Sequence, residues 1–216
     1  MVSIIGSVVS KISRKMKKAG DLVVKKIPTL FVREYDDGGI ILTRDVMPGL
    51  EWVLKGEGEA TEKVDGAACA IINGVLYKRY DAKRGKEPPK GAIPCQPEAD
   101  PITGHWPHWV KVDTRITADK WFVQAWVNTP WAVSDGTYEA VGIHFQSNPY
   151  GLDADFLENH GRIKVKDFPR DFDGMREYLR THFIEGVVFW KDGEPRCKIK
   201  RSDFGFNWPV RWEGKP

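Results

Sequence analysis

Short apolar runs separated by glycine-containing turns dominate the chain from residue 27 onward. Apolar residues at 67–72 and 75–77 flank Asn73-Gly74, and the runs 186–190 and 197–200 flank Asp192-Gly193. Asn-Gly and Asp-Gly between apolar runs favour tight β-hairpin turns. The pattern therefore predicts two hairpins, and it predicts that Lys63 opens the first strand of the first one.

Other runs extend this β-rich pattern. Apolar residues at 27–32 and 40–42 surround a turn at 36–39, and alternation predicts strands at 121–126 and 136–145. Residues 48–54 are expected to form a short helix. A longer helix is predicted after a capping residue, Asp173, because apolar residues follow at helical spacing: Met175, Tyr178, Leu179 and Phe183. Six prolines fall within 84–109, which predicts a long loop that is either functional or disordered.

Composition is ordinary for a soluble globular protein. The 216 residues are 41% hydrophobic and 29% charged, enough for one well-buried domain. No run of 18 apolar residues predicts a membrane span, and residues 1–10 lack the order of a secretory signal. Three widely separated cysteines suggest free thiols in a reducing, intracellular and cytoplasmic compartment. We expect a monomer without membrane contact.

Positive charge is concentrated before the core and after the first predicted hairpin. Five lysines and arginines fall within 11–18, so residues 1–26 are expected to form a basic extension before a domain at 27–216. That extension could touch a phosphate backbone or be the solvated face of a helix. The second basic cluster, at 78–86, directly follows the first predicted hairpin.

Two lysine positions carry the candidate chemistry. Lys63 precedes Asp65 and Gly66, so an amine, an orienting carboxylate and a residue permitting close approach stand together. Alone, such a short pattern also occurs by chance. Lys198 and Lys200 share one face of a predicted strand because side chains alternate. They fit an anionic ligand, or edge lysines that oppose aggregation.

Together these segments resemble a known superfamily. Lys63-Val64-Asp65-Gly66, Arg79, Glu139, Glu185-Gly186-Val187-Val188 and Lys198-Ile199-Lys200 occur in this order. The series resembles the covalent nucleotidyltransferases, which include ATP-dependent RNA and DNA ligases and mRNA capping enzymes. Further stretches are most similar to a small group of 5′–3′ RNA ligases that includes the vertebrate enzyme: Gly104-His105-Trp106-Pro107, Asn148-Pro149-Tyr150-Gly151-Leu152 and Trp208-Pro209.

The resemblance implies an α+β adenylyltransferase domain, with two twisted, mainly antiparallel sheets and flanking helices around an ATP groove. Its implied chemistry has three steps: Lys63 attacks the α-phosphorus of ATP, AMP passes to an RNA 5′-phosphate, and an RNA 3′-hydroxyl displaces AMP. A lysine must lose its proton to attack. Lys198, Lys200 and Arg79, with Mg²⁺ or Mn²⁺, would disfavour the charged amine and offset negative charge in the transition state.

By resemblance, Asp65 belongs with Lys63, Lys198 and Lys200 to the catalytic group. Glu62 would face the adenine edge, and Ile163 occupies the position where related ligases carry an aromatic residue that stacks on adenine. Arg79 would contact ribose or RNA phosphate. Glu139 would hold a ribose hydroxyl, and Glu185, with Glu139, would bind the metal.

Several alternatives remain at this stage. A GTP-dependent capping-type guanylyltransferase would carry similar residues, and so would a non-catalytic protein that binds RNA ends. The short segment after Lys200 leads us to expect no separate C-terminal barrel domain of the OB type, which favours RNA ends in RNA repair. Trp106 and Trp109 are the tryptophans expected to stack on bases.

Overall fold

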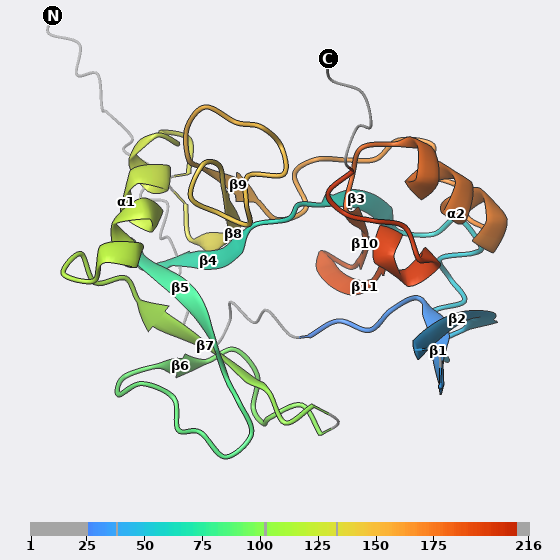
Figure 1. The fold of residues 1–216 in the computed structure, drawn as a ribbon, viewed down its shortest axis with the longest axis horizontal. Helices are drawn as coiled ribbons and strands as arrows, with labels where there is room; N and C mark the ends of the chain where they lie inside the picture. The colour runs from blue at the N-terminus through green and yellow to red at the C-terminus, as the bar shows by residue number, and fades with distance from the viewer. Residues whose placement is uncertain (1–25, 38, 102, 133, 211–216) are drawn as a thin grey trace, which may run out of the picture.

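The computed structural model describes residues 26–37, 39–101, 103–132 and 134–210. The expected basic extension at 1–26 lies almost wholly outside them. Within the described part, every strand pair is antiparallel, and the strands form one two-stranded, one three-stranded and one six-stranded sheet. Figure 1 shows the two larger sheets side by side, each accompanied by one α-helix. The α+β expectation is confirmed.

The three-stranded sheet has the order β11-β10-β3 and the six-stranded sheet has the order β6-β7-β5-β4-β8-β9. The first contains β3 (Glu59–Lys63), β10 (Gly186–Lys191) and β11 (Glu194–Lys200). The second contains β4 (Ala67–Ile72), β5 (Val75–Ala82), β6 (Ile93–Pro94), β7 (Trp106–Lys111), β8 (Gly136–Val141) and β9 (Phe156–Asn159). The chain passes from one sheet to the other directly after β3 (Figure 1).

Both predicted hairpins form. Asn73-Gly74 joins β4 to β5, and Asp192-Gly193 joins β10 to β11; all four turn residues have positive φ. The position of Lys63 was predicted wrongly, because it ends β3 and does not open the β4–β5 hairpin. Gly66 explains the break: an added Cβ would lie 2.9 Å from Val141 Cγ1 and closer still to the carbonyl oxygen of Ala140. The chain therefore presses against β8 where it changes sheets.

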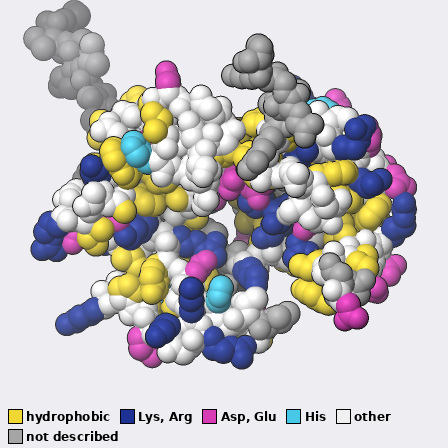
Figure 2. All heavy atoms as spheres, viewed as in Figure 1, with side chains coloured by type: hydrophobic (Ala, Val, Ile, Leu, Met, Phe, Trp, Pro, Cys, Tyr) yellow, Lys and Arg dark blue, Asp and Glu magenta, His cyan; other side chains and the backbone are white. Residues whose placement is uncertain are grey.

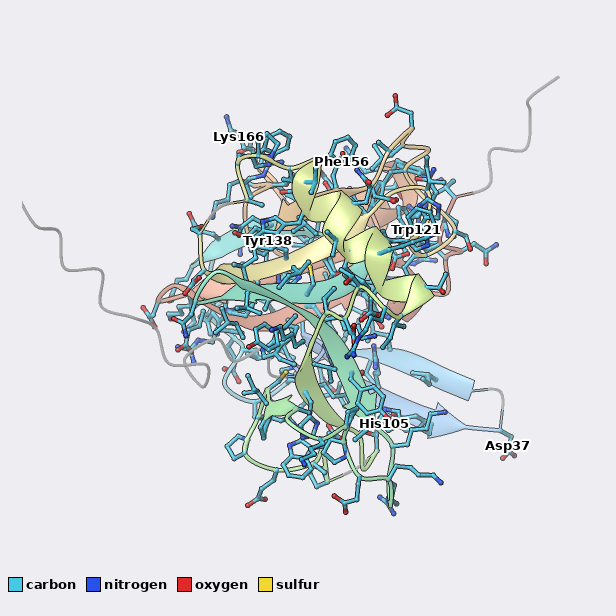
Figure 3. All side chains as sticks on the ribbon, turned by 90° about the vertical axis from the view of Figure 1, so that its left-hand side faces the viewer. Asp37, His105, Trp121, Tyr138, Phe156 and Lys166 are labelled. Carbon is cyan, nitrogen blue, oxygen red and sulfur yellow. The ribbon has the colours of Figure 1, made fainter. Side chains whose placement is uncertain are left out.

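A further hairpin stands beside the three-stranded sheet. It pairs β1 (Phe31–Asp36) with β2 (Gly39–Val46), as the pattern predicted. Figure 3 shows it projecting from the body, with Asp37 at its tip. Residues 48–54, expected to be helical, form successive turns that bury Val53.

The helix α1 (Lys120–Val127), preceded by the 3₁₀ turn η2 (Thr117–Asp119), corrects the strand predicted at 121–126. It lies over the six-stranded sheet (Figure 3), and its Trp121 packs on the same core cluster as Tyr138 of β8. The helix buries Ala125 completely and packs Phe122 and Trp126 on the same core. Its aromatic residues favour strands intrinsically, but burial against the sheet decides for the helix.

The helix α2 (Phe172–Thr181) covers the three-stranded sheet and is followed later by the 3₁₀ turn η3 (Arg201–Phe204). Met175, Tyr178 and Leu179 lie in the helix as predicted, and Met175 and Leu179 are fully buried; Phe183, predicted to belong to the helix, follows its end. The cap was misplaced: Asp171 accepts the Gly174 N–H at 2.8 Å, whereas Asp173 lies in the first turn and pairs with Arg44. No helix in the described ranges is long and apolar enough to span a membrane.

Candidate functional site

Lys63 lies in a row of residues that crosses the three-stranded sheet. Gly186 pairs with Lys63 on one side and with Lys200 on the other. Paired residues of antiparallel strands project from the same face, so both lysines point to one side with only a hydrogen between them. A Cβ on Gly186 would lie 2.9 Å from the Lys200 Cα and closer still to the Ile199 carbonyl oxygen. Glycine at 186 therefore allows the strands to bring two amines together.

Lys198 belongs to the same face. It pairs with Val188, which in turn pairs with Thr61, two residues before Lys63. The outer side of β11 is occupied here, because Lys198 O accepts the Leu30 N–H at 2.8 Å and Lys198 N–H donates to Pro28 O at 3.0 Å. Lys198 is thus not a free edge lysine, and the anti-aggregation reading of this residue is wrong.

Positive charge is crowded around Lys198. Burial, followed by the nearby Lys63 and Lys200, lowers the pKa of Lys198 from its ordinary value of 10.5 to about 8. Glu185 opposes that shift and Arg33 adds to it. A buried amine among other cations gains most from an anionic ligand, and phosphate oxygens meet that requirement.

Glu185 is the carboxylate in contact with the candidate nucleophile. Its Oε2 lies 2.5 Å from Lys63 Nζ, and the Glu185 side chain is only 12% exposed. Burial raises the pKa of Glu185, and its nearest cation, Lys63, offsets part of that rise. The carboxyl group is therefore placed to exchange a proton with the amine.

Asp65 is fixed by two aromatic residues that sequence reasoning had given no role. Its backbone N–H donates to the Tyr150 hydroxyl at 2.7 Å, and its Oδ2 accepts the Trp208 indole N–H at 2.9 Å. These partners lie 85 and 143 residues away along the chain. Both had appeared only within stretches of family resemblance, so the signal existed without a chemical assignment.

Arg79 and Glu139 lie in the six-stranded sheet and share a face. Glu139 pairs with Ala68, and Ala70 pairs with Tyr77, two residues before Arg79. Alternation therefore places Arg79 and Glu139 on the same side as Ala68 and Ala70. Arg79 contacts Asp81, with Nε 2.8 Å from Oδ1. Figure 2 shows a hollow between the two larger sheets, bordered by basic and acidic side chains.

Glu139 has one satisfied and one unsatisfied carboxylate oxygen. His160 Nε2 lies 3.0 Å from Oε1, and His160 Nδ1 lies 2.9 Å from the Thr137 hydroxyl. The second oxygen, Oε2, is buried and has no hydrogen-bond partner in the structure. Buried carboxylate oxygens normally have a donor, so this atom fits a ligand hydroxyl.

Glu62 and Ile163 are neighbours, although not on the face that carries Lys63. The Glu62 N–H donates to Ile163 O at 2.8 Å. Glu62 pairs with the core residue Val187, so its side chain leaves β3 on the side opposite Lys63. Burial, with the nearby Glu158 carboxylate, raises the pKa of Glu62. Ile163 is 37% exposed and remains available to cover a ligand.

Arg33 is another residue that the sequence did not indicate. One of its guanidinium nitrogens binds Asp203, whose second oxygen accepts the Lys200 N–H at 2.8 Å. Arg33 Nε is buried without a partner in the structure. The hairpin β1–β2 thus adds a third cation beside Lys198, after Lys63 and Lys200.

Metal and base-stacking expectations fare differently. No group of three or more His, Cys, Asp or Glu in the described part could hold a metal alone. Mg²⁺ commonly takes one or two protein carboxylates together with phosphate oxygens, so Glu185 remains a suitable ligand.

Trp109, expected to stack on a base, is completely buried in the core, whereas Trp106 donates its indole N–H to Gln96 O at 2.9 Å.

Three known proteins that share one name are similar in sequence to this chain. The chain matches no protein-family model. It is 24% identical to RNA ligase 1 of Mus musculus over 90% of the chain and 84% of that protein. RNA ligase 1 of Danio rerio gives 24% over 90% and 85%, and that of Rattus norvegicus gives 24% over 70% and 68%. The three relatives share one name, so the chain is similar over most of its length to the vertebrate RNA ligase 1 proteins.

Proposed function

We propose that this protein is an ATP-dependent RNA ligase that joins a 5′-phosphate to a 3′-hydroxyl through AMP carried on Lys63. The observation that carries the proposal is the convergence of Lys63, Lys198 and Lys200 on one face of the three-stranded sheet, with the Glu185 carboxylate in contact with Lys63. The three relatives, each named RNA ligase 1, support the choice of RNA. The two larger sheets lie side by side with a hollow between them (Figures 1 and 2), which supports an adenylyltransferase fold around a nucleotide groove.

The residues present suit ATP and a divalent cation. Lys198 and Lys200 supply positive charge for phosphate oxygens, and the unpaired Oε2 of Glu139 can accept a ribose hydroxyl. Arg79 lies on the same face as Glu139 and would contact ribose or RNA phosphate. Glu185 and the phosphate oxygens would together hold Mg²⁺ or Mn²⁺. The bound cation would offset negative charge on the phosphates.

The chain's own groups can prepare the nucleophile. Glu185 accepts one proton from the Lys63 ammonium, which is the group it contacts. The neutral amine then forms an N–P bond as the bond between the α-phosphorus and the pyrophosphate oxygen breaks, and the second proton leaves to solvent. Lys198 and Lys200 stabilise the negative charge that grows on the phosphates. An RNA 5′-phosphate next takes the AMP, and a 3′-hydroxyl displaces it.

Radioactive nucleotide labelling tests this proposal. Incubation with Mg²⁺ and α-labelled ATP is expected to label the protein covalently and release pyrophosphate. Lys63→Ala should abolish the label, while Lys111→Ala, which removes an exposed lysine from β7, should keep it. Labelling by GTP alone would indicate a guanylyltransferase. RNA-end binding that survives Lys63→Ala, with no labelling by any nucleotide in the wild type, would reject catalysis.

A further inference from the structure

The short connection that follows Lys63 is held from outside by two remote segments. Residues 64–66 link β3 to β4 directly after Lys63, so their conformation bears on the end of the strand that carries the Lys63 side chain. Tyr150 and Trp208 contact Asp65 at its backbone and its carboxylate, respectively. A third contact reaches the next residue along the chain, since Gln146 Nε2 donates to Gly66 O at 3.2 Å.

The segment that carries Gln146 and Tyr150 is itself tightly built. Three consecutive residues, 146–148, have positive φ between 46° and 58°. Non-glycine residues rarely adopt this conformation, so tertiary contacts must maintain it. Asn148 supplies two hydrogen bonds within the loop. Its side chain accepts the Leu152 N–H at 3.0 Å and donates to Leu152 O at 2.8 Å. The loop is closed on itself and presents Tyr150 to Asp65.

Trp208 is anchored from a different direction. Arg201 is 5% exposed, and its guanidinium donates to Asn207 O at 3.1 Å and to His182 O at 2.9 Å. The backbone just before Trp208 is thereby tied to the end of α2. Trp208 also lies near the Tyr150 and Phe183 rings, with centroids 6.0 Å and 5.1 Å away.

The polar atoms of Tyr150 and Trp208 make directional hydrogen bonds to Asp65, whereas their rings make packing contacts. Burial, together with the carboxylates of Glu62, Asp65 and Glu185, raises the pKa of Tyr150, so its hydroxyl stays protonated at neutral pH. The hydroxyl therefore accepts the Asp65 N–H and keeps its own hydrogen for a second partner. The hydrogen bond from the Trp208 indole N–H to the Asp65 carboxylate is charge-assisted, and such bonds are stronger than those between neutral groups.

We infer that Tyr150 and Trp208 are positioning residues that hold Asp65, and through it the 64–66 connection, so that Lys63 is aimed at the α-phosphorus. This inference rests on the proposed function. Neither residue needs to touch ATP, because each acts through a hydrogen bond to Asp65. The chain thus commits two segments, 146–152 and 205–210, to fixing one short connection.

The contact itself is tested without catalysis. Tyr150→Phe removes the acceptor and keeps the ring, so amide hydrogen exchange at Asp65 should rise roughly tenfold in the full chain. Tyr138→Phe is the matched control: it removes another phenol that donates to a backbone carbonyl, Ser134 O, in the core beneath α1. It should leave exchange at Asp65 unchanged. Unchanged exchange in Tyr150→Phe would overturn the inference.

The positioning role is tested by the kinetics of Lys63 labelling. Tyr150→Phe and Trp208→Phe should each lower the maximal rate about tenfold while the ATP concentration for half-maximal rate changes less than about twofold. Trp126→Phe is the control for Trp208. The Trp126 indole N–H also donates a hydrogen bond, to the backbone carbonyl Ala132 O at 2.8 Å, but this contact lies outside the candidate site. Equal losses in variants and controls, or losses that saturating ATP removes, would overturn the inference. A wild type that takes no label would reject the proposed function instead.

Discussion

Lys198 carries its charge where the folded protein disfavours it. Burial, with Lys63 and Lys200 nearby, lowers its pKa from 10.5 to about 8. In the unfolded chain Lys198 has its ordinary pKa, so a protonated Lys198 lowers the free energy of unfolding of the protein. Lys198→Met keeps the length of the side chain and removes the charge. We therefore expect this variant to be more stable than the wild type and to lose nucleotide transfer.

The size of the effect follows from the two pKa values. The interval from 10.5 to about 8 corresponds to roughly 3 kcal/mol, since each pKa unit is about 1.4 kcal/mol. That interval already includes the opposing attraction of Glu185. Replacing buried charged groups by apolar ones of similar volume typically gains about 1–4 kcal/mol, so we expect a net gain of about 1–3 kcal/mol. The sign depends on pH: the wild-type penalty is complete below pH 8 and disappears as pH rises from about 8 to 10.5.

Denaturant unfolding at pH 7, 8.5 and 10 measures this difference. Lys198→Met should have the higher midpoint at pH 7, and its advantage should shrink at each higher pH. Lys111→Met, an exposed lysine in β7, should change stability by less than about 0.5 kcal/mol at every pH. A variant less stable than the wild type at pH 7, or an advantage equal at pH 7 and 10, would refute the reasoning.

Two further substitutions test the geometry of the site. Gly186→Ala should destabilise the fold by about 2 kcal/mol or more, because the added methyl meets the β11 backbone. Gly136→Ala, whose Cβ would lie 3.5 Å from its nearest neighbour, should cost less than about 1 kcal/mol in the same unfolding assay; equal losses would contradict this reasoning. Glu139→Gln should raise the KM for ATP in Lys63 labelling about tenfold by replacing an acceptor for the ribose hydroxyl. An unchanged KM would remove Glu139 from the nucleotide site.

Local chemistry made the hairpins predictable. Asn73-Gly74 and Asp192-Gly193 specify their turns within two residues, although the N–H groups of Asn73 and Gly74 also donate to the carboxylate of Asp135. The helix α2 was predictable for a similar reason, since Met175 and Leu179 repeat at helical spacing. The opposite held for α1: its aromatic residues favour a strand locally, and only packing against the six-stranded sheet makes the helix preferable.

The candidate site was predictable in its members but not in its arrangement. Charged residues at 63, 185, 198 and 200 stand out in the sequence because strands rarely bury such groups without a ligand. Nothing in the sequence indicates that Val64-Asp65-Gly66 joins two sheets, since the same residues would suit the start of a hairpin. The contacts of Asp65 to Tyr150 and Trp208 also had no local signal, because they join segments far apart in the chain.

The passage of the chain from β3 to β4 has a mechanical consequence. The three-stranded sheet and the six-stranded sheet bury separate hydrophobic cores, and the candidate nucleophile stands on the last residue before the crossing. A small rotation of one core against the other would swing the amine relative to Arg79 and Glu139 on the far side. Substitutions deep within either core, remote from Lys63, are therefore expected to lower the proposed transfer of AMP while each half remains well folded.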